Sequence, residues 1–369
     1  MTPHPPRRPV ELTRPIRGAI LLVAFVAAVA GLRAAAPVLT PLAVALFVAG
    51  VSLPVVAGLR RLGVRPSLAI AATVLLDAAV VAALVWIVVV TVDEMRAAMP
   101  GYLAQLQAVE RELRGWFATR GITLPAELYE PLLQPQRVLD LVTFVARNLT
   151  SWLSLVLLLL LYLVFILVEA VQLPAKVRRV LGPDAPAIAM SATVLQQVQR
   201  YLAVKTLVSL LTGLSIGVGA SLLGVDFAPF WGLLAFALNY IPTVGSIIAA
   251  VPAVTVALLQ LGAERALLLA VVYLGANVLF GNITDPILVG RQLRLAPIVV
   301  LTSLVFWGWV WGITGAFLAV PLTITLRVAL QSSRRWGYLA ALMGPIDDDT
   351  PALAATAAST PTQSGASTG

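Results

Sequence analysis

The apolar residues of this chain lie in long unbroken runs, not in short alternating segments. Between about residue 18 and residue 330, runs of roughly 20 apolar residues recur, and a helix of that length crosses the roughly 30 Å hydrocarbon core of a bilayer. Strands of a membrane barrel would instead alternate apolar and polar residues over about ten positions. The pattern therefore predicts an all-α integral membrane protein, a polytopic helical bundle whose outer surface contacts the lipid bilayer.

About eight hydrophobic segments are expected, and six of them are full spans. These six spans are predicted at 18–35, 38–58, 68–92, 149–170, 202–224 and 264–284. Residues 93–148 have an ordinary soluble composition with helical spacing of apolar positions, which predicts a small extramembrane helical insert. The two ends, residues 1–17 and 343–369, are rich in Pro or in Ala, Ser and Thr, and are predicted to be disordered.

Two more apolar stretches, 227–260 and 296–330, are each interrupted near the middle. The breaks are NYIPTVG at 239–245 and GWVWGITG at 308–315. Each half is short for a bilayer crossing, and Pro or Gly in mid-helix frees backbone groups that lipid cannot satisfy. We therefore predict two re-entrant hairpins within a core that occupies residues 149–342.

The two interrupted stretches resemble each other. Ala228-Pro229 recurs as Ala296-Pro297, and the tripeptide AVP at 250–252 recurs at 319–321. Broken hydrophobic segments in corresponding positions are typical of transporters whose solute site lies near the bilayer midplane. The alternative is that such short matches arise by chance in an Ala-rich sequence.

Composition agrees with a membrane protein and removes several classes of chemistry. Hydrophobic residues make up 60% of the chain and charged residues 11%, too few charges to cover the surface of a soluble protein of this length. The sequence has no Cys and a single His, His4, so neither a thiolate or His metal site nor a Ser-His-Asp triad can form. No enzyme activity, metal or cofactor is expected, and no G-x-x-x-x-G-K-[ST] phosphate loop is present for ATP.

The basic charge is better explained by membrane orientation than by nucleic acid. The formal net charge is +8, and membrane proteins collect Lys and Arg on their cytoplasmic loops. With the N-terminus inside, the predicted path places most of the 25 Lys and Arg residues on the cytoplasmic side. The sequence therefore predicts a multi-pass membrane protein, N-in and C-in, with hairpins that enter from opposite sides and with no nucleic-acid partner.

Ionisable residues at membrane depth are costly and are therefore candidates for function. Asp77 lies near the middle of the third predicted span and is the clearest candidate for reversible binding of a proton or a cation. The alternative is a structural role, in which Asp77 stays neutral or pairs with a residue such as Lys205. Glu169, Lys205 and Arg327 lie near predicted span ends, where snorkelling to the membrane interface explains them.

The broken segments and the span between them supply the remaining candidates for a solute or ion pathway. Freed backbone groups and nearby polar side chains can coordinate a solute where protein or water surrounds them. The candidates are Asn239, Tyr240, Pro242, Gly245, Asn277, Asn282, Asp285, Pro286, Gly290, Gly312, Gly315 and Pro321. For the small residues the alternative is tight helix packing in lipid, and the Trp residues at 307–311 fit an aromatic belt at the membrane interface.

Three separated motifs resemble those of the autoinducer-2 exporter family. NYIPTVG at 239–245 is similar to the family's N-[FY]-I-P-x-[VI]-G core, and NITDPILVGRQLRLAP at 282–297 is similar to its N-x-x-x-P-x-[ILV]-x-G-x-x-L-x-L-x-P segment. WGITGAFLAVP at 311–321 is similar to the ending F-G-[IL]-x-G-x-x-x-A-[VI]-P. Trp311 stands where the family more often has Phe, and Ala296 where it often has His. The resemblance covers about residues 15–335.

This resemblance implies secondary transport out of the bacterial cell by a homo-oligomer. Some family members are associated with a furanone signalling molecule, and others with sodium or proton antiport. We therefore expect an efflux transporter of a small polar solute that is coupled to Na⁺ or H⁺ and works by alternating access, with Asp77 or Asp285 as the coupling group. Two alternatives stay open, an antiporter that moves only cations and a non-transporting scaffold or accessory protein whose insert binds a partner.

Overall fold

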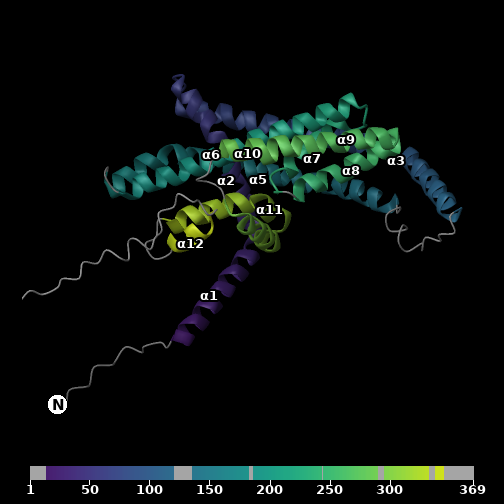
Figure 1. Cartoon of the computed structure of the whole chain (residues 1–369). Helices are drawn as coiled ribbons and strands as arrows, with labels where there is room; N and C mark the ends of the chain where they lie inside the picture. Colours follow the sequence, from purple (N-terminus) through teal and green to yellow (C-terminus); the bar gives the residue numbers. More distant parts are fainter. Residues whose placement is uncertain are drawn as a thin grey trace, which may run out of the picture.

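The computed structural model describes residues 14–119, 135–182, 186–242, 244–289, 295–331 and 337–344, and these residues form helices and no strand (Figure 1). The elements are α1 (Arg14–Ala34), α2 (Ala36–Arg61), α3 (Pro66–Ala118), α5 (Pro135–Leu181), α6 (Pro186–Leu222), α7 (Ala228–Leu238), α8 (Val244–Leu261), α9 (Ala263–Ala276), the π-helix η1 (Asn277–Thr284), α10 (Asp285–Val289), α11 (Pro297–Gln331) and α12 (Gly337–Leu342). The predicted all-α fold is confirmed.

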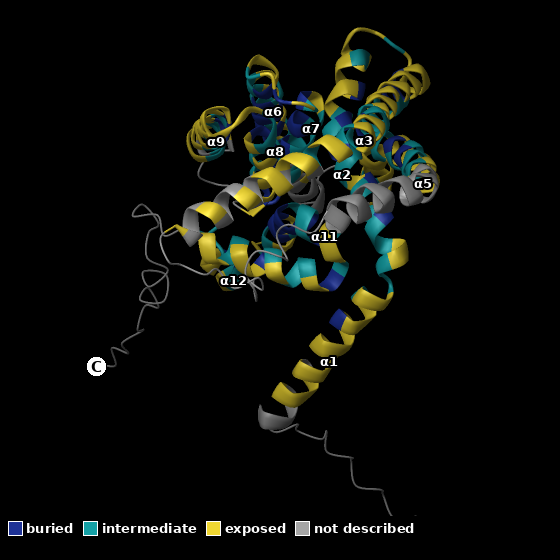
Figure 2. Ribbon diagram, turned by 90° about the vertical axis from the view of Figure 1, so that its right-hand side faces the viewer, coloured by how far each residue is buried: buried dark blue, intermediate teal, exposed yellow. Residues whose placement is uncertain are grey.

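Seven of these helical segments are long and apolar enough to cross a bilayer. They are Ala36–Arg61, Pro66–Tyr102, Ser154–Val180, Leu195–Leu222, Val244–Leu261, Ala263–Thr284 and Pro297–Gln331. The first predicted span corresponds to α1, whose described apolar part, Gly18–Ala34, is shorter than these seven. α1 projects away from the other helices, and most of its side chains are exposed, as expected for a helix that faces lipid (Figure 1, Figure 2).

The C-terminal end of α1 is held by tryptophans of α11. Trp311 Nε1 donates a 3.0 Å hydrogen bond to the carbonyl oxygen of Leu32, and the guanidinium carbon of Arg33 lies 4.8 Å from the ring centroid of Trp309. These tryptophans therefore make specific contacts within the protein, beyond the interfacial role that the sequence suggested.

The helix that contains the third span does not end where the insert was predicted to begin, at residue 93. α3 continues through Asp93 to Ala118, and α5 begins at Pro135, well before the fourth span. The insert is thus built from extensions of two membrane helices, and residues 120–134 lie outside the described residues. The two ends that were predicted to be disordered also lie mostly outside the described residues, although α1 already begins at Arg14.

α6 lies at the centre of the bundle and makes its closest approach to α7. A Cβ added to Gly232 of α7 would lie 2.7 Å from the carbonyl oxygen of Gly213 on α6 and 3.0 Å from the Cα of Gly217. Glycines allow helix backbones to approach in this way inside a membrane. The core beside this contact includes three fully buried alanines of α8 spaced four residues apart, Ala249, Ala253 and Ala257.

The first interrupted stretch forms a helical hairpin, α7–α8, whose two ends lie together. α7 ends at Leu238 and α8 begins at Val244, so the break falls within the predicted stretch. At the base, Gln260 Nε2 donates to Asp226 Oδ1 at 2.8 Å, and the Asp226 amide donates to Gln260 Oε1 at 2.9 Å. The prediction that both arms are short is wrong for α8, because its 18 residues are enough to cross a bilayer by length.

The second interrupted stretch, α11, also forms a hairpin. Gly312 has a φ of 64° and a ψ of −145°, in a region that glycine enters far more readily than other residues, and the chain reverses direction there. Ser303 Oγ donates to the Ala319 carbonyl oxygen at 2.9 Å, so the arms before and after Gly312 lie along each other. The base is tied to α12, since the Ala296 amide donates to the Met343 carbonyl oxygen at 3.0 Å.

The two hairpins enter the bundle from opposite ends of α6. The base of the first hairpin lies at the C-terminal end of α6, where Gln260 Nε2 also donates to the Gly224 carbonyl oxygen at 3.2 Å. The base of the second hairpin lies near the start of the membrane-crossing part of α6, Leu195–Leu222, because Leu295, Val300 and Val328 pack with Tyr201 and Leu202 there. α10 lies at the same level, where Arg200 of α6 donates to the Leu288 carbonyl oxygen at 3.4 Å. Which of these ends faces the cytoplasm stays a prediction.

Candidate functional site

A row of buried polar side chains runs along one face of α6. Tyr201, Lys205, Ser209 and Thr212 are spaced three or four residues apart, which places them on one side of a helix, and none is more than 7% exposed. Thr212 is satisfied within its own helix, because its Oγ1 donates to the Val208 carbonyl oxygen at 2.9 Å. We call these four residues the polar row. Polar groups buried at membrane depth are rare and mark candidate functional sites.

The tip of the first hairpin is hydrogen-bonded to α6 beside the polar row. Asn239 Nδ2 donates to Ser209 Oγ at 3.0 Å, and the Tyr240 hydroxyl donates to Thr206 Oγ1 at 2.9 Å. Asn239 and Tyr240 are both buried. The structure thus brings these two predicted site residues together against a helix that had supplied none of the predicted candidates.

The two hairpins meet at the ring of Tyr240. Between ring centroids, Tyr240 lies 4.7 Å from Phe317 of the second hairpin, 5.4 Å from Phe47 of α2 and 5.8 Å from Phe236 of α7. We call these four rings the aromatic cluster. Because Tyr240 lies within the first break and Phe317 follows closely on Gly312 in the second, the cluster is a place where the broken segments touch near their turns.

Lys205 pairs with Asp285 and not with Asp77. Lys205 Nζ lies 3.7 Å from Asp285 Oδ2, and the two side chains are 8% and 23% exposed. The other oxygen, Asp285 Oδ1, is buried and has no hydrogen-bond partner among the residues that the structure describes. The prediction that Lys205 snorkels from a span end is wrong, because α6 extends beyond it in both directions and its neighbours cover it.

Asp285 comes directly after the π-helix η1. In a π-helix each amide bonds to the carbonyl five residues earlier, and such turns occur frequently at functional sites. At the start of η1, Asn277 Oδ1 accepts a 3.0 Å hydrogen bond from Ser246 Oγ of α8. Asn277 and Asp285 therefore place the two ends of the π-helix against the first hairpin and α6.

Gly245 and Gly315 have matching roles in the two hairpins. A Cβ on Gly245 would overlap the carbonyl oxygen of Leu238 in the preceding arm, and a Cβ on Gly315 would overlap the carbonyl oxygen of Trp307. Each glycine therefore allows the second arm to close against the first just after the turn. This agrees with the packing alternative for both residues, and the shared geometry agrees with the predicted repeat.

The other predicted site residues lie at the margins of this arrangement. Pro242, in the turn of the first hairpin, and Pro321, in the second arm of the second, are half-buried. Asn282 is exposed on η1. The side chain of Pro286 and the whole of Gly290 lie outside the described residues.

Asp77 lies on α3, outside the polar row. Its Oδ2 accepts a 2.8 Å hydrogen bond from Ser52 Oγ, and Ser52 is buried on α2. The predicted alternative of a pair with Lys205 is wrong, since Lys205 lies against Asp285. The bond to Ser52 joins two neighbouring helices and gives Asp77 a structural reason to stand in a membrane span.

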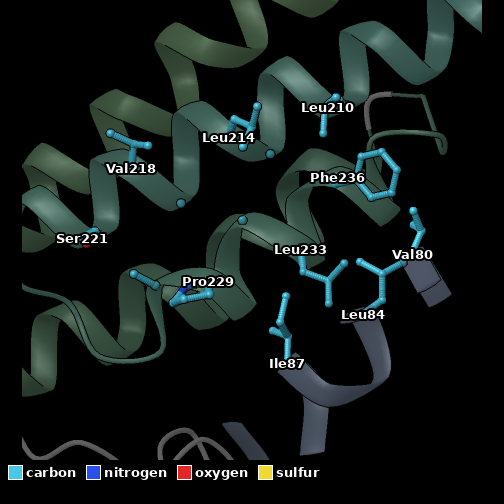
Figure 3. Close-up of a pocket in the computed structure, with 14 residues that line it drawn as sticks. Val80, Leu84, Ile87, Leu210, Leu214, Val218, Ser221, Pro229, Leu233 and Phe236 are labelled. Carbon is cyan, nitrogen blue, oxygen red and sulfur yellow. The ribbon is translucent and has the colours of Figure 1, made fainter. Parts of the chain in front are cut away.

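An apolar cavity lies next to the aromatic cluster, between α3, α6 and α7 (Figure 3). Its volume is about 490 Å³, and Phe236 belongs both to its wall and to the aromatic cluster. Other side chains that point into it are Val80, Leu84, Ile87, Leu210, Leu214 and Leu233. Because its lining is almost entirely apolar, this cavity suits a hydrocarbon group better than a polar solute.

The polar row, the first hairpin tip and Asp285 together can exchange hydrogen bonds with a solute and carry charge. Sequence reasoning missed Lys205 and Ser209 as site residues, although polar residues four apart in an otherwise apolar helix were a readable signal. Phe317 had no such signal, because its partner Tyr240 belongs to the other hairpin.

Membrane-crossing helices and two opposed broken hairpins whose tips meet beside buried polar groups define a polytopic membrane transport protein. Residues 21–335 match the AI-2E family transporter, and the chain belongs to this family. The family resemblance of the three sequence motifs is therefore confirmed.

Three bacterial relatives match this chain over nearly their whole length. The AI-2 transport protein TqsA of Escherichia coli K12 is 32% identical over 342 residues, which are 93% of this chain and 99% of TqsA. YhhT of Escherichia coli K12 is 33% identical over 324 residues, 88% of this chain and 93% of YhhT. A Haemophilus influenzae protein is 33% identical over 333 residues, 89% of this chain and 96% of its own length. The chain is thus similar to these proteins along most of its length, and it is a membrane transporter.

Proposed function

We propose that this protein exports a small polar solute across the bacterial cytoplasmic membrane as a secondary transporter. The observation that carries the proposal is the contact of two opposed hairpin tips, at Tyr240 and Phe317, beside the polar row. Broken helices at membrane depth are tolerated only where protein covers them or where they line a cavity, and in transporters they form the solute site. Alternating access would follow from movement of one hairpin relative to the other around this site.

The proposal includes coupling to Na⁺ or H⁺, because export against a gradient needs an energy source. Asp285 is the favoured coupling group, since it contacts the polar row and has one oxygen without a partner in the described part of the chain. Asp77 is the second candidate, although its bond to Ser52 already accounts for its position. The proposal involves no cofactor and no catalytic step.

The relatives suggest which solute to test first. The name of TqsA states AI-2 transport for that protein, and we propose autoinducer-2, or a solute of similar size and polarity, for this one. The N-in and C-in orientation is proposed from the distribution of basic residues. A homo-oligomeric state is proposed from the family resemblance.

A second candidate function is Na⁺/H⁺ antiport without an organic solute. The observation that favours it is the pair Lys205–Asp285, which places an amine and a carboxylate together inside the bundle. A non-transporting accessory role, in which the insert binds a partner, is the alternative from another class of protein.

Efflux from proteoliposomes tests the proposal. Purified protein is reconstituted with autoinducer-2 inside, and efflux is followed after a pH or sodium gradient is imposed. We expect gradient-driven efflux with wild-type protein and with Leu62→Ala, a control at an exposed position away from the site. We expect Asp285→Asn to lose the response to the gradient.

Other results of the efflux experiment would favour antiport or the accessory role. Sodium-dependent proton movement without efflux of any organic solute would replace solute export with antiport. Absence of both fluxes under every gradient, from protein that is folded and inserted, would favour the accessory role.

A further inference from the structure

Lys205 is unusual for its residue type as well as for its position. Two of the 25 basic residues in the sequence are lysines, Lys176 and Lys205, and the other 23 are arginines. Lys176 is an exposed residue that forms a 2.8 Å ion pair with Glu169. Lys205 is 7% exposed and is the only buried basic residue in the described part of the chain. Arginine stays protonated inside proteins, whereas a buried lysine can give up its proton.

One carboxylate neutralises Lys205, and that carboxylate is incompletely bound. Asp285 Oδ2 lies 3.7 Å from Lys205 Nζ, while Asp285 Oδ1 is buried without a partner among the described residues. Among the residues that the structure describes, the other charged or titratable groups beside the pair are Arg200 and Tyr201 on α6 and Tyr240 from the first hairpin.

Of the other helices that pack around α6, α2, α7, η1 and α11 contain no carboxylate. Glu264 of α9 lies in the first turn of that helix, beside Arg265, which donates to the Leu223 carbonyl oxygen at the C-terminal end of α6. Glu169 of α5 is paired with Lys176, and the side chain of Asp140 lies outside the described residues. Asp285 is therefore the counter-charge available to Lys205.

We propose that Lys205 is a proton-exchanging group and that a monovalent cation competes with it for Asp285. In one state the Lys205 ammonium neutralises the Asp285 carboxylate. In the other state the cation lies against the carboxylate and Lys205 is a neutral amine. One cation enters as one proton leaves Nζ, so the charge of the site does not change. The inference rests on the proposed ion coupling and names the two groups that perform it.

The competition has an electrostatic cause. A buried carboxylate with two cations, or with none, leaves an uncompensated charge in a medium of low dielectric constant, which is strongly unfavourable. The site therefore holds one positive charge at a time. When a cation occupies Asp285, the interaction that keeps a buried ammonium charged is lost, and the amine releases its proton.

The pair is placed where its state can be transmitted to the first hairpin. Tyr240 at the hairpin tip bonds to Thr206, the residue that follows Lys205. Asp285 ends the π-helix whose first residue, Asn277, is bonded to Ser246 of α8. Exchange of a proton for a cation thus moves the positive charge from Lys205 to the cation at Asp285, next to the tip and the second arm of the first hairpin.

Proton release from purified protein tests the inference directly. Sodium chloride is added to protein in a weakly buffered detergent solution with a pH indicator, and choline chloride is the salt control. We expect wild-type protein to release about one proton per chain in response to sodium alone, because one amine changes its protonation state. Lys205→Met, which has no proton to release, and Asp285→Asn, which has no carboxylate for the cation, are expected to release none.

Lys205→Arg is the sharper variant, because it keeps a positive charge opposite Asp285 but cannot release a proton. The matched controls are Lys176→Arg and Lys176→Met, the same substitutions at the exposed ion pair, and both should release protons like wild-type protein. Sodium-evoked release that persists in folded Lys205→Arg overturns the inference. Absence of release from wild-type protein with sodium, lithium and potassium overturns it as well.

The proton-release experiment and the efflux experiment can give opposite results, so the inference and the proposed function can be rejected independently. Gradient-driven efflux of autoinducer-2 without cation-evoked proton release would overturn the role of Lys205 and leave solute export standing. Proton release that needs Lys205, without efflux of any solute, would support the exchange and remove solute export.

Discussion

Tyr240 at the tip of the first hairpin lies against Phe317 of the second, with 4.7 Å between the ring centroids. The hydroxyl of the same tyrosine reaches Thr206 on α6, at 2.9 Å. One side chain therefore joins both broken segments and the helix that carries the polar row. The ring and the hydroxyl have different roles, and substitutions can separate them.

We expect Tyr240→Ala to lower solute efflux at least tenfold and Tyr240→Phe to lower it only slightly. Ala removes the ring contacts with Phe47, Phe236 and Phe317, whereas Phe removes only the bond to Thr206, worth about 0.5–1.5 kcal/mol. Efflux from proteoliposomes with equal amounts of protein is the measurement, and Thr206→Val should match Tyr240→Phe. Wild-type efflux from Tyr240→Ala would mean that contact between the hairpin tips is not needed for transport.

Ala at Gly245 or Gly315 should prevent correct folding. In both cases the added Cβ would overlap a backbone carbonyl oxygen of the preceding arm, which cannot move aside as a flexible side chain can. Gly275→Ala is the matched control, because an added Cβ there meets no atom within 4 Å, and Ala is favoured over Gly inside a helix by about 1 kcal/mol. The yield of monodisperse protein after purification checks this. Normal yield of both Gly245→Ala and Gly315→Ala would show that the hairpins close less tightly than described.

Tyr102 and Asp226 should stabilise the base of the first hairpin together. The Tyr102 hydroxyl, on α3, donates to Asp226 Oδ2 at 2.6 Å, and Asp226 is also bonded to Gln260 of α8. We expect Tyr102→Phe to cost about 1.5 kcal/mol of stability, the lower end for a bond to a charged group, because Asp226 is exposed. Hydrogen exchange of the backbone amides of residues 224–227 should also become faster, because these residues form the base of the first hairpin.

A double-mutant cycle distinguishes this bond from unrelated effects. Tyr102→Phe should cost almost nothing more once Asp226→Ala is present, because either substitution removes the hydrogen bond between the two side chains. Additive losses of thermal stability would contradict a direct link between α3 and the first hairpin.

Asp77→Asn should keep the response of efflux to an imposed gradient, in contrast to Asp285→Asn. Asp77 is bonded to Ser52 and joins α2 to α3, so we expect Ser52→Ala and Asp77→Ala to lower the melting temperature by similar small amounts. Asp77→Asn keeps a side-chain oxygen that can accept from Ser52 and should change the melting temperature less. Efflux under pH and sodium gradients checks the functional half of the prediction. If Asp77→Asn lost the response while Ser52→Ala kept it, Asp77 would be the coupling group.

The membrane fold and the positions of its breaks are readable from local sequence. Lipid requires long apolar helices, so runs such as those at 38–58 and 202–224 specify spans without reference to the rest of the chain. The breaks at 239–245 and near Gly312 also fall where Pro and Gly interrupt the apolar pattern. Pro alone does not specify a break, because α8 continues through Pro252 and α11 through Pro321. The length of α8 was missed, because the apolar pattern does not show where a helix resumes after a break.

The pairing of residues across the bundle depended on tertiary packing. From the sequence, Lys205 was a possible partner of Asp77 in the structural alternative, and Lys205 was placed near a span end. In the structure Lys205 lies against Asp285, and Asp77 against Ser52. The apolar pattern of a helix shows that it is buried in lipid or protein, but the rotation of the helix about its axis and the neighbour that covers each face come from how all the helices fit together.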